Sequence, residues 1–147
     1  MPVITLNHAN RAEVHALLAL QSWSVTCLCA AWCDVCKVFR SQFDLLAARH
    51  PDVPMLWIDI EDEAEVVDAY DVENFPTLLI QRGETTAFYG SIEADIAMAH
   101  RLVQAHTRAE ANAHPLAAAS ASASAPAGAD NAPTPSLLRQ LALALPA

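Results

Sequence analysis

The sequence predicts an α/β sandwich, in which a central mixed β-sheet carries helices on both faces. Apolar runs of strand length alternate along the first hundred residues with segments whose apolar side chains recur at helical spacing. Two strand-like runs then follow each other with only Arg82, Gly83 and Glu84 between them, which is typical of an antiparallel hairpin. The predicted order is β-α-β-α-β-α-β-β-α, and this order places helices on both faces of one sheet.

The individual elements follow from local patterns. Strand-like runs of mostly aliphatic and β-branched side chains cover residues 3–6, 24–30, 55–60, 77–81 and 85–89. Apolar side chains at intervals of three and four predict a helix that follows Asn10 and is broken by residues 22–24, and further helices over residues 33–49 and 92–108. A cluster of acidic residues from position 61 marks the start of another. The odd-numbered side chains of residues 24–30 should share one face of their strand.

Charge and composition exclude several classes of function. The 147-residue chain has a net charge of −9 with only 8 Lys and Arg, so nucleic acids and anionic membranes are poor partners. No segment has the length of a transmembrane helix, and the first residues lack the pattern of a signal peptide. We therefore expect a cytoplasmic protein whose four cysteines are not a structural disulfide framework.

The chain divides into three segments. Residues 1–108 form the predicted domain, residues 109–135 are a flexible linker rich in Ala, Ser and Pro, and residues 136–147 are rich in leucine. Such a short helix is marginal in water by itself. We expect residues 136–145 to form an amphipathic helix that docks on an apolar partner surface, such as a second copy of the chain. The alternative is a tail that stays disordered.

The pair Cys33 and Cys36 stands where a strand gives way to a helix. Unpaired N–H groups and the helix dipole stabilise an anion at a helix start, so Cys33 can act as a thiolate nucleophile. Cys36 lies about one turn deeper, shielded but close enough to close a disulfide with Cys33. The arrangement predicts a redox-active dithiol in which Cys33 attacks and Cys36 resolves.

A zinc site is the alternative for these cysteines. It requires four ligands that converge tetrahedrally, and Cys27 and Cys29 would have to supply the other two. Both precede the motif on an extended strand and should point into the packed face of the sheet, so convergence around Cys33 is geometrically awkward. We therefore expect no metal.

The segment from Trp32 to Lys37 resembles the active site of the thioredoxin family. The similarity extends over about residues 3–108 and includes the central strand Trp57-Ile58-Asp59, the Phe75-Pro76-Thr77 segment, and the late glycine Gly90. This resemblance implies a thioredoxin-like three-layer sandwich that acts on disulfides of other proteins.

The family resemblance also implies a substrate-binding surface. Pro76 would follow a cis peptide bond beside the two cysteines, whereas an ordinary trans turn is the general expectation for proline. The adjacent backbone would then pair with an extended substrate. Trp32, Phe75 and Gly90 would complete that surface.

Several positions depart from the family pattern. Cys27 stands where thioredoxins usually have a buried aspartate, and Trp57 stands where they usually have a lysine. A buried thiol accepts a proton poorly at neutral pH, so we expect Cys27 to be a small core residue. Asp34 and Val35 replace the usual Gly-Pro between the cysteines. Asp34 either raises the pKa of the thiols or is a solvated acid with little effect on them.

Two functions therefore compete. The first is a thiol–disulfide oxidoreductase that reduces protein disulfides, needs no bound cofactor beyond a redox-active Cys33–Cys36 disulfide, and receives electrons from a separate reductase. The second is a thioredoxin-fold binding or chaperone-like module with weak or no turnover. The missing buried acid and the appended tail favour the second function, whereas the intact Trp-Cys-x-x-Cys-Lys motif favours the first.

Overall fold

The computed structural model describes residues 3–20, 23–93, 95–111 and 134–145. Its strands are β1 (Ile4–Thr5), β2 (Trp23–Cys29), β3 (Met55–Asp59), β4 (Thr77–Arg82) and β5 (Thr85–Ser91). Its helices are α1 (Arg11–Leu20), α2 (Asp34–Arg49), α3 (Ala64–Val67), α4 (Ile96–Ala111) and α6 (Leu137–Ala144). From β1 to α4 the elements follow the predicted order, which confirms the α/β fold class.

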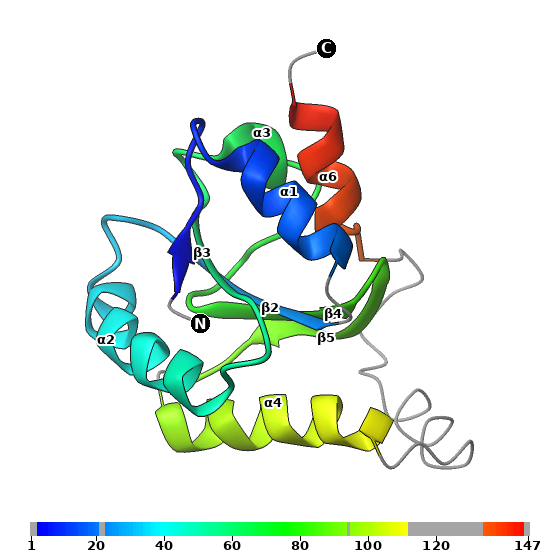
Figure 1. The fold of residues 1–147 in the computed structure, drawn as a ribbon. Coiled ribbons are helices and arrows are strands. Elements are labelled where there is room, and N and C mark those ends of the chain that lie inside the picture. The colour runs from blue at the N-terminus through cyan, green and yellow to red at the C-terminus, as the bar shows by residue number, and fades with distance from the viewer. Residues whose placement is uncertain (1–2, 21–22, 94, 112–133, 146–147) are drawn as a thin grey trace.

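The five strands form one mixed sheet in the order β1-β3-β2-β4-β5 (Figure 1). Strands β1, β3 and β2 are parallel, whereas β4 runs antiparallel to β2 and β5 antiparallel to β4. The predicted hairpin joins β4 to β5, and its Gly83 has a positive φ of 60°, which glycine adopts without steric cost. The central strand β2 therefore leads directly from the middle of the sheet into the Cys-x-x-Cys segment.

Helices cover both faces of the sheet (Figure 1). Side chains of Val25, Cys27 and Cys29 belong to the core between the sheet and α2 and α4. Leu28 belongs to the opposite core, which α1, α3 and α6 cover. This alternation confirms that the odd-numbered side chains of β2 share one face.

The C-terminal helix α6 packs against the domain itself. Its Leu137 and Leu141 are fully buried in the core that also contains Leu18 of α1 and Val66 of α3. The predicted helix therefore forms, but the apolar surface that it covers is on its own chain rather than on a partner. Most of the predicted linker, residues 112–133, lies outside the described residues.

Polar contacts fix the start of α6 to the sheet. The side-chain oxygen of the buried Gln81 accepts a hydrogen bond from the backbone N–H of Leu137 at 3.0 Å. The side-chain amide of Gln81 and the hydroxyl of Tyr70 both donate to the carbonyl of Pro135, at 2.8 and 2.6 Å. Ser136 caps the helix by accepting from the N–H of Arg139 at 3.2 Å. Both the backbone and the apolar face of this segment thus have partners in the domain.

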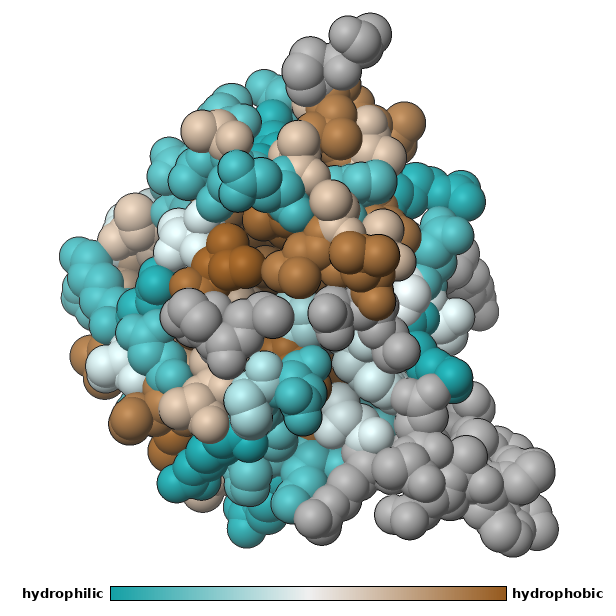
Figure 2. All heavy atoms as spheres, viewed as in Figure 1, coloured by the Kyte–Doolittle hydropathy of each residue, from teal (hydrophilic) through white to brown (hydrophobic). Residues whose placement is uncertain are grey.

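Hydrophobic residues gather on one face of the molecule over α1 and α6 (Figure 2). Leu20 at the end of α1 and Leu143 of α6 are 83% and 75% exposed. Helix α6 therefore buries only part of its apolar surface against the domain. In the described part of the chain, no helix has the length and apolar content needed to cross a membrane.

Candidate active site

Cys33 lies at the junction of β2 and α2. A tight turn reverses the chain here, because the N–H of Cys33 donates to the carbonyl of Ala30 at 3.0 Å. Cys33 is the N-cap residue of α2, and its carbonyl accepts from the N–H of Lys37 at 3.1 Å. Its side chain is free and partly buried, and it makes no capping hydrogen bond. The thiol therefore sits at the positive end of the helix dipole, as the sequence predicted.

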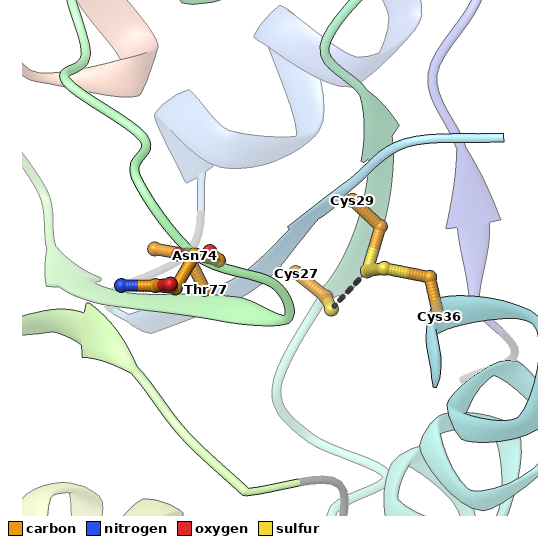
Figure 3. The surroundings of a disulfide bond; sticks show 5 residues. All are labelled: Cys27, Cys29, Cys36, Asn74 and Thr77. Carbon is orange, nitrogen blue, oxygen red and sulfur yellow. Dashed lines mark hydrogen bonds between the residues drawn. A yellow bond between two sulfur atoms is a disulfide. The ribbon is translucent and has the colours of Figure 1, made fainter. Parts of the chain in front are cut away.

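Cys36 is buried on the first turn of α2 and forms a disulfide with Cys29 of β2 (Figure 3). The Cα atoms of the pair are 5.9 Å apart, within the usual range for disulfides. The disulfide in the structure is therefore not the Cys33–Cys36 pair expected from the motif spacing. The difference arises because the buried side of α2 turns Cys36 toward the face of β2 on which Cys29 lies.

Cys27 completes this group of sulfur atoms. Its Sγ lies 3.7 Å from the Sγ of Cys29, and its side chain is fully buried (Figure 3). Burial raises the pKa of the Cys27 thiol, and the positive charge of Arg40 offsets part of that rise. The strand cysteine Cys29 thus reaches the motif at Cys36, whereas the sequence argument concerned ligands converging around Cys33. Among the described residues, no group of three or more His, Cys, Asp or Glu side chains is placed to hold a metal ion.

The loop before β4 brings the proline beside the cysteines. The peptide bond between Phe75 and Pro76 is cis, as the family resemblance implied. In the antiparallel pairing of β2 with β4, the last pair is Leu28 with Thr77, so Pro76 lies at the end of β4 toward which β2 runs on to Cys29. In the view of Figure 3, Cys27 lies between the labelled residues of this loop, Asn74 and Thr77, and the disulfide.

Aromatic and backbone groups flank this loop. The rings of Trp32 and Phe75 meet edge to face with centroids 5.4 Å apart, and Trp32 remains 63% exposed. Gly90 pairs with Leu78 in the hairpin, and the N–H of Ile92 donates to the carbonyl of Pro76 at 2.9 Å. The structure therefore brings Trp32, Phe75 and Pro76 to one site and places Gly90 on the strand next to it.

The two residues between the motif cysteines face solvent. The Asp34 side chain is 95% exposed and lies 3.7 Å from the ammonium group of Lys37, whose own side chain is 63% exposed. Val35 is 48% exposed. This exposure favours the interpretation of Asp34 as a solvated acid, because water and Lys37 both screen its charge.

Arg40 is a functional candidate that the sequence analysis missed. Cys27 and Trp57 are paired neighbours on β2 and β3, at the positions where the family usually has an aspartate and a lysine. The Arg40 guanidinium lies 5.2 Å from the centre of the Trp57 ring and hydrogen-bonds to Asp44 and Thr5. Spacing could have identified Arg40, because it follows Cys36 by one helical turn on the same face of α2.

Comparison with known proteins identifies the family of this chain. A family model described as Thioredoxin matches residues 5–101, which is more than half of the chain. Thioredoxin H2-1 of Oryza sativa subsp. japonica is 39% identical over 54 residues, or 37% of this chain and 39% of that protein. Putative thioredoxin 2 of Streptomyces coelicolor is 32% identical over 59 residues, or 40% of this chain and 44% of that protein. The matches thus span less than half the length of these relatives.

Solved structures share the fold at lower identity. Thioredoxin NaTrxh from Nicotiana alata has a TM-score of 0.62 and 22% identity, with 71% of this chain and 92% of that chain covered. Mitochondrial thioredoxin 3 from Saccharomyces cerevisiae has a TM-score of 0.58 and 19% identity, with 69% and 93% covered. The chain belongs to the thioredoxin family, and its fold is the thioredoxin-like sandwich that the sequence resemblance implied.

Proposed function

We propose that this protein is a thiol–disulfide oxidoreductase that reduces disulfide bonds of other proteins. The observation that carries the proposal is the free Cys33 thiol at the N-terminus of α2. The other three cysteines are each at most 1% exposed, so Cys33 is the sulfur that a protein substrate can reach.

In the proposed reaction the Cys33 thiolate attacks one sulfur of a substrate disulfide. The substrate S–S bond breaks, a Cys33–substrate disulfide forms, and the other substrate sulfur leaves as a thiolate that takes up a proton. The Cys36 thiolate then attacks the Cys33 sulfur, which releases the second substrate thiol and leaves a Cys33–Cys36 disulfide. Two electrons pass from the protein to the substrate.

The cycle requires a separate reductase as electron donor. Cys36 is bonded to Cys29 in the structure, so the donor must free it before Cys36 can resolve a mixed disulfide. A cytoplasmic location is part of this proposal, because that compartment keeps thiols reduced.

The surface around Cys33 suits a protein substrate. Trp32 and Val35, which precede and follow Cys33 in the sequence, present apolar side chains to solvent, and Phe75 packs against Trp32. These side chains would cover the apolar flanks of an extended substrate, while backbone groups next to Pro76 would pair with its main chain. Trp32, Phe75, Pro76 and Gly90 are the residues proposed to bind substrate.

A binding or chaperone-like module with little turnover is the second candidate. It is favoured by the bond between Cys36 and Cys29, which leaves Cys33 without its resolving partner. It is also favoured by Cys27, which holds its proton in the place of the usual carboxylate.

Reduction of insulin by dithiothreitol separates these candidates. The oxidoreductase proposal predicts that the wild-type protein accelerates insulin precipitation and that Cys33→Ser abolishes the acceleration. A wild-type protein that binds insulin but leaves the rate at that of dithiothreitol alone would support the binding module and overturn the oxidoreductase.

A further inference from the structure

The four cysteines of this chain form one connected group. Cys29 is bonded to Cys36, the Sγ of Cys27 lies 3.7 Å from that of Cys29, and Cys33 packs against the core cluster that contains the other three. The two-cysteine reaction proposed above uses only Cys33 and Cys36. It leaves Cys29, which is already within disulfide geometry of Cys36, without a role.

We propose that Cys29 is a third member of the redox site. Its sulfur displaces Cys33 from the Cys33–Cys36 disulfide and becomes bonded to Cys36. The consequence of this exchange for substrates rests on the oxidoreductase function proposed above. The oxidised protein would then exist in two forms, one with Cys33 in the disulfide and one with Cys33 free.

The exchange balances without any further oxidant or reductant. After substrate reduction, the Cys29 thiolate attacks the Cys36 sulfur of the Cys33–Cys36 disulfide. The bond between Cys33 and Cys36 breaks, a bond between Cys29 and Cys36 forms, and Cys33 leaves as a thiolate. The proton lost by Cys29 is matched by one that Cys33 can take up, so the chain keeps one disulfide and two thiols.

Two features of the structure favour the form with Cys33 free. The Cys29–Cys36 disulfide lies wholly in the apolar core between β2 and α2, where water and external thiols have little access. The Cys33 sulfur is instead released at the N-terminus of α2, where the helix dipole stabilises a thiolate.

The exchange would change how the oxidised protein treats a disulfide substrate. An oxidised two-cysteine site has no free nucleophile and releases its substrate. Here the oxidised chain would keep Cys33 free, so it could still form a mixed disulfide with a second substrate. Because Cys36 is then bonded to Cys29, that mixed disulfide would persist until an external thiol reduces the chain.

Disulfide mapping of the full-length protein tests this proposal. The reduced chain is oxidised with oxidised glutathione, quenched in acid, blocked with N-ethylmaleimide and cut with chymotrypsin. Cleavage after Leu28, Trp32 and Phe39 gives one peptide of residues 29–32, which carries Cys29, and one of residues 33–39, which carries both motif cysteines.

The two pairings give different products in this experiment. The proposal predicts that the peptides 29–32 and 33–39 are cross-linked, with maleimide or glutathione on Cys33. Cys29→Ala should instead give peptide 33–39 closed by an internal disulfide, whereas Cys27→Ala, a matched change in the same core, should keep the cross-link. A wild-type protein that shows only the internally closed peptide 33–39, with maleimide on Cys29, would overturn the proposal.

The disulfide mapping and the insulin assay test different proposals, so a negative result in one does not imply a negative result in the other. Glutathione replaces the protein substrate in the mapping, so a chain that never reduces insulin can still show or lack the cross-link. Loss of insulin reduction would refute the oxidoreductase, and loss of the cross-link would refute only the role of Cys29.

Discussion

Replacing Leu141 with alanine tests whether α6 is an integral part of the domain. The Leu141 side chain is fully buried, and a buried leucine cut back to alanine typically costs about 2–5 kcal/mol of unfolding free energy. Alanine is the best helix former, so the helix itself should not be weakened and the loss would come from packing. With a urea m-value of about 2 kcal/mol/M, the smallest expected loss lowers the midpoint by about 1 M.

Leu143 provides the matched control in the same helix. It is 75% exposed, so Leu143→Ala should change the unfolding free energy by no more than about 0.5 kcal/mol. Urea titrations followed by circular dichroism give both values. Equal midpoints for Leu141→Ala, Leu143→Ala and wild type would refute the docking of α6 on its own domain.

Three further outcomes follow from the site and its surroundings. Alkylation of the reduced protein at neutral pH should modify Cys33 first, because the other thiols are buried, and earlier labelling of Cys27 would contradict its place in the core. Burial lowers the pKa of His50 below its ordinary value of 6.5, and His100, with a ring nitrogen 2.9 Å away, acts in the same direction. The folded state therefore binds fewer protons than the unfolded state, so stability should fall as the pH drops below about 6.5, and His50→Gln should weaken this dependence in urea titrations. Cys27→Asp should speed release of a mixed disulfide at neutral pH, because the carboxylate supplies a proton acceptor that the control Cys27→Asn lacks. An unchanged release rate in a folded Cys27→Asp variant would show that a proton acceptor at position 27 does not assist release.

Local patterns were sufficient to predict most of the fold. Alternating side chains in β2 correctly indicated which residues share one face of the sheet, and the hairpin was indicated by Gly83 between two strand-like runs. These features depend on residues close together in the sequence, and the sequence therefore carries them directly. Their prediction does not depend on knowing the tertiary packing.

Contacts between distant segments were not predictable in the same way. The Cys-x-x-Cys spacing indicated Cys33 as the partner of Cys36, but the choice of Cys29 depends on how α2 packs against β2. Arg11 of α1 carries a charge, yet it is buried and pairs with Glu63 at 2.9 Å, 52 positions further on. Such pairings arise only when the sheet and helices assemble.

The surface that α6 covers also depended on the tertiary structure. Its leucines predicted an amphipathic helix on a partner surface, but the same apolar face can pack on the parent domain, as it does in the structure. The choice is made by Gln81 and Tyr70, whose side chains hydrogen-bond the segment that begins α6. Neither residue stands out in the sequence, because each looks like an ordinary member of a strand or helix end.

Trapping of a mixed disulfide tests whether Cys33 is the nucleophile toward protein disulfides. Removal of Cys36 leaves the first step intact and prevents the second, so Cys36→Ser mixed with insulin should accumulate a covalent adduct that dithiothreitol releases. The double variant Cys33→Ser with Cys36→Ser should form none. Peptide mapping should place the adduct on Cys33. An adduct that persists in the double variant, or the absence of an adduct in Cys36→Ser, would show that Cys33 is not the nucleophile.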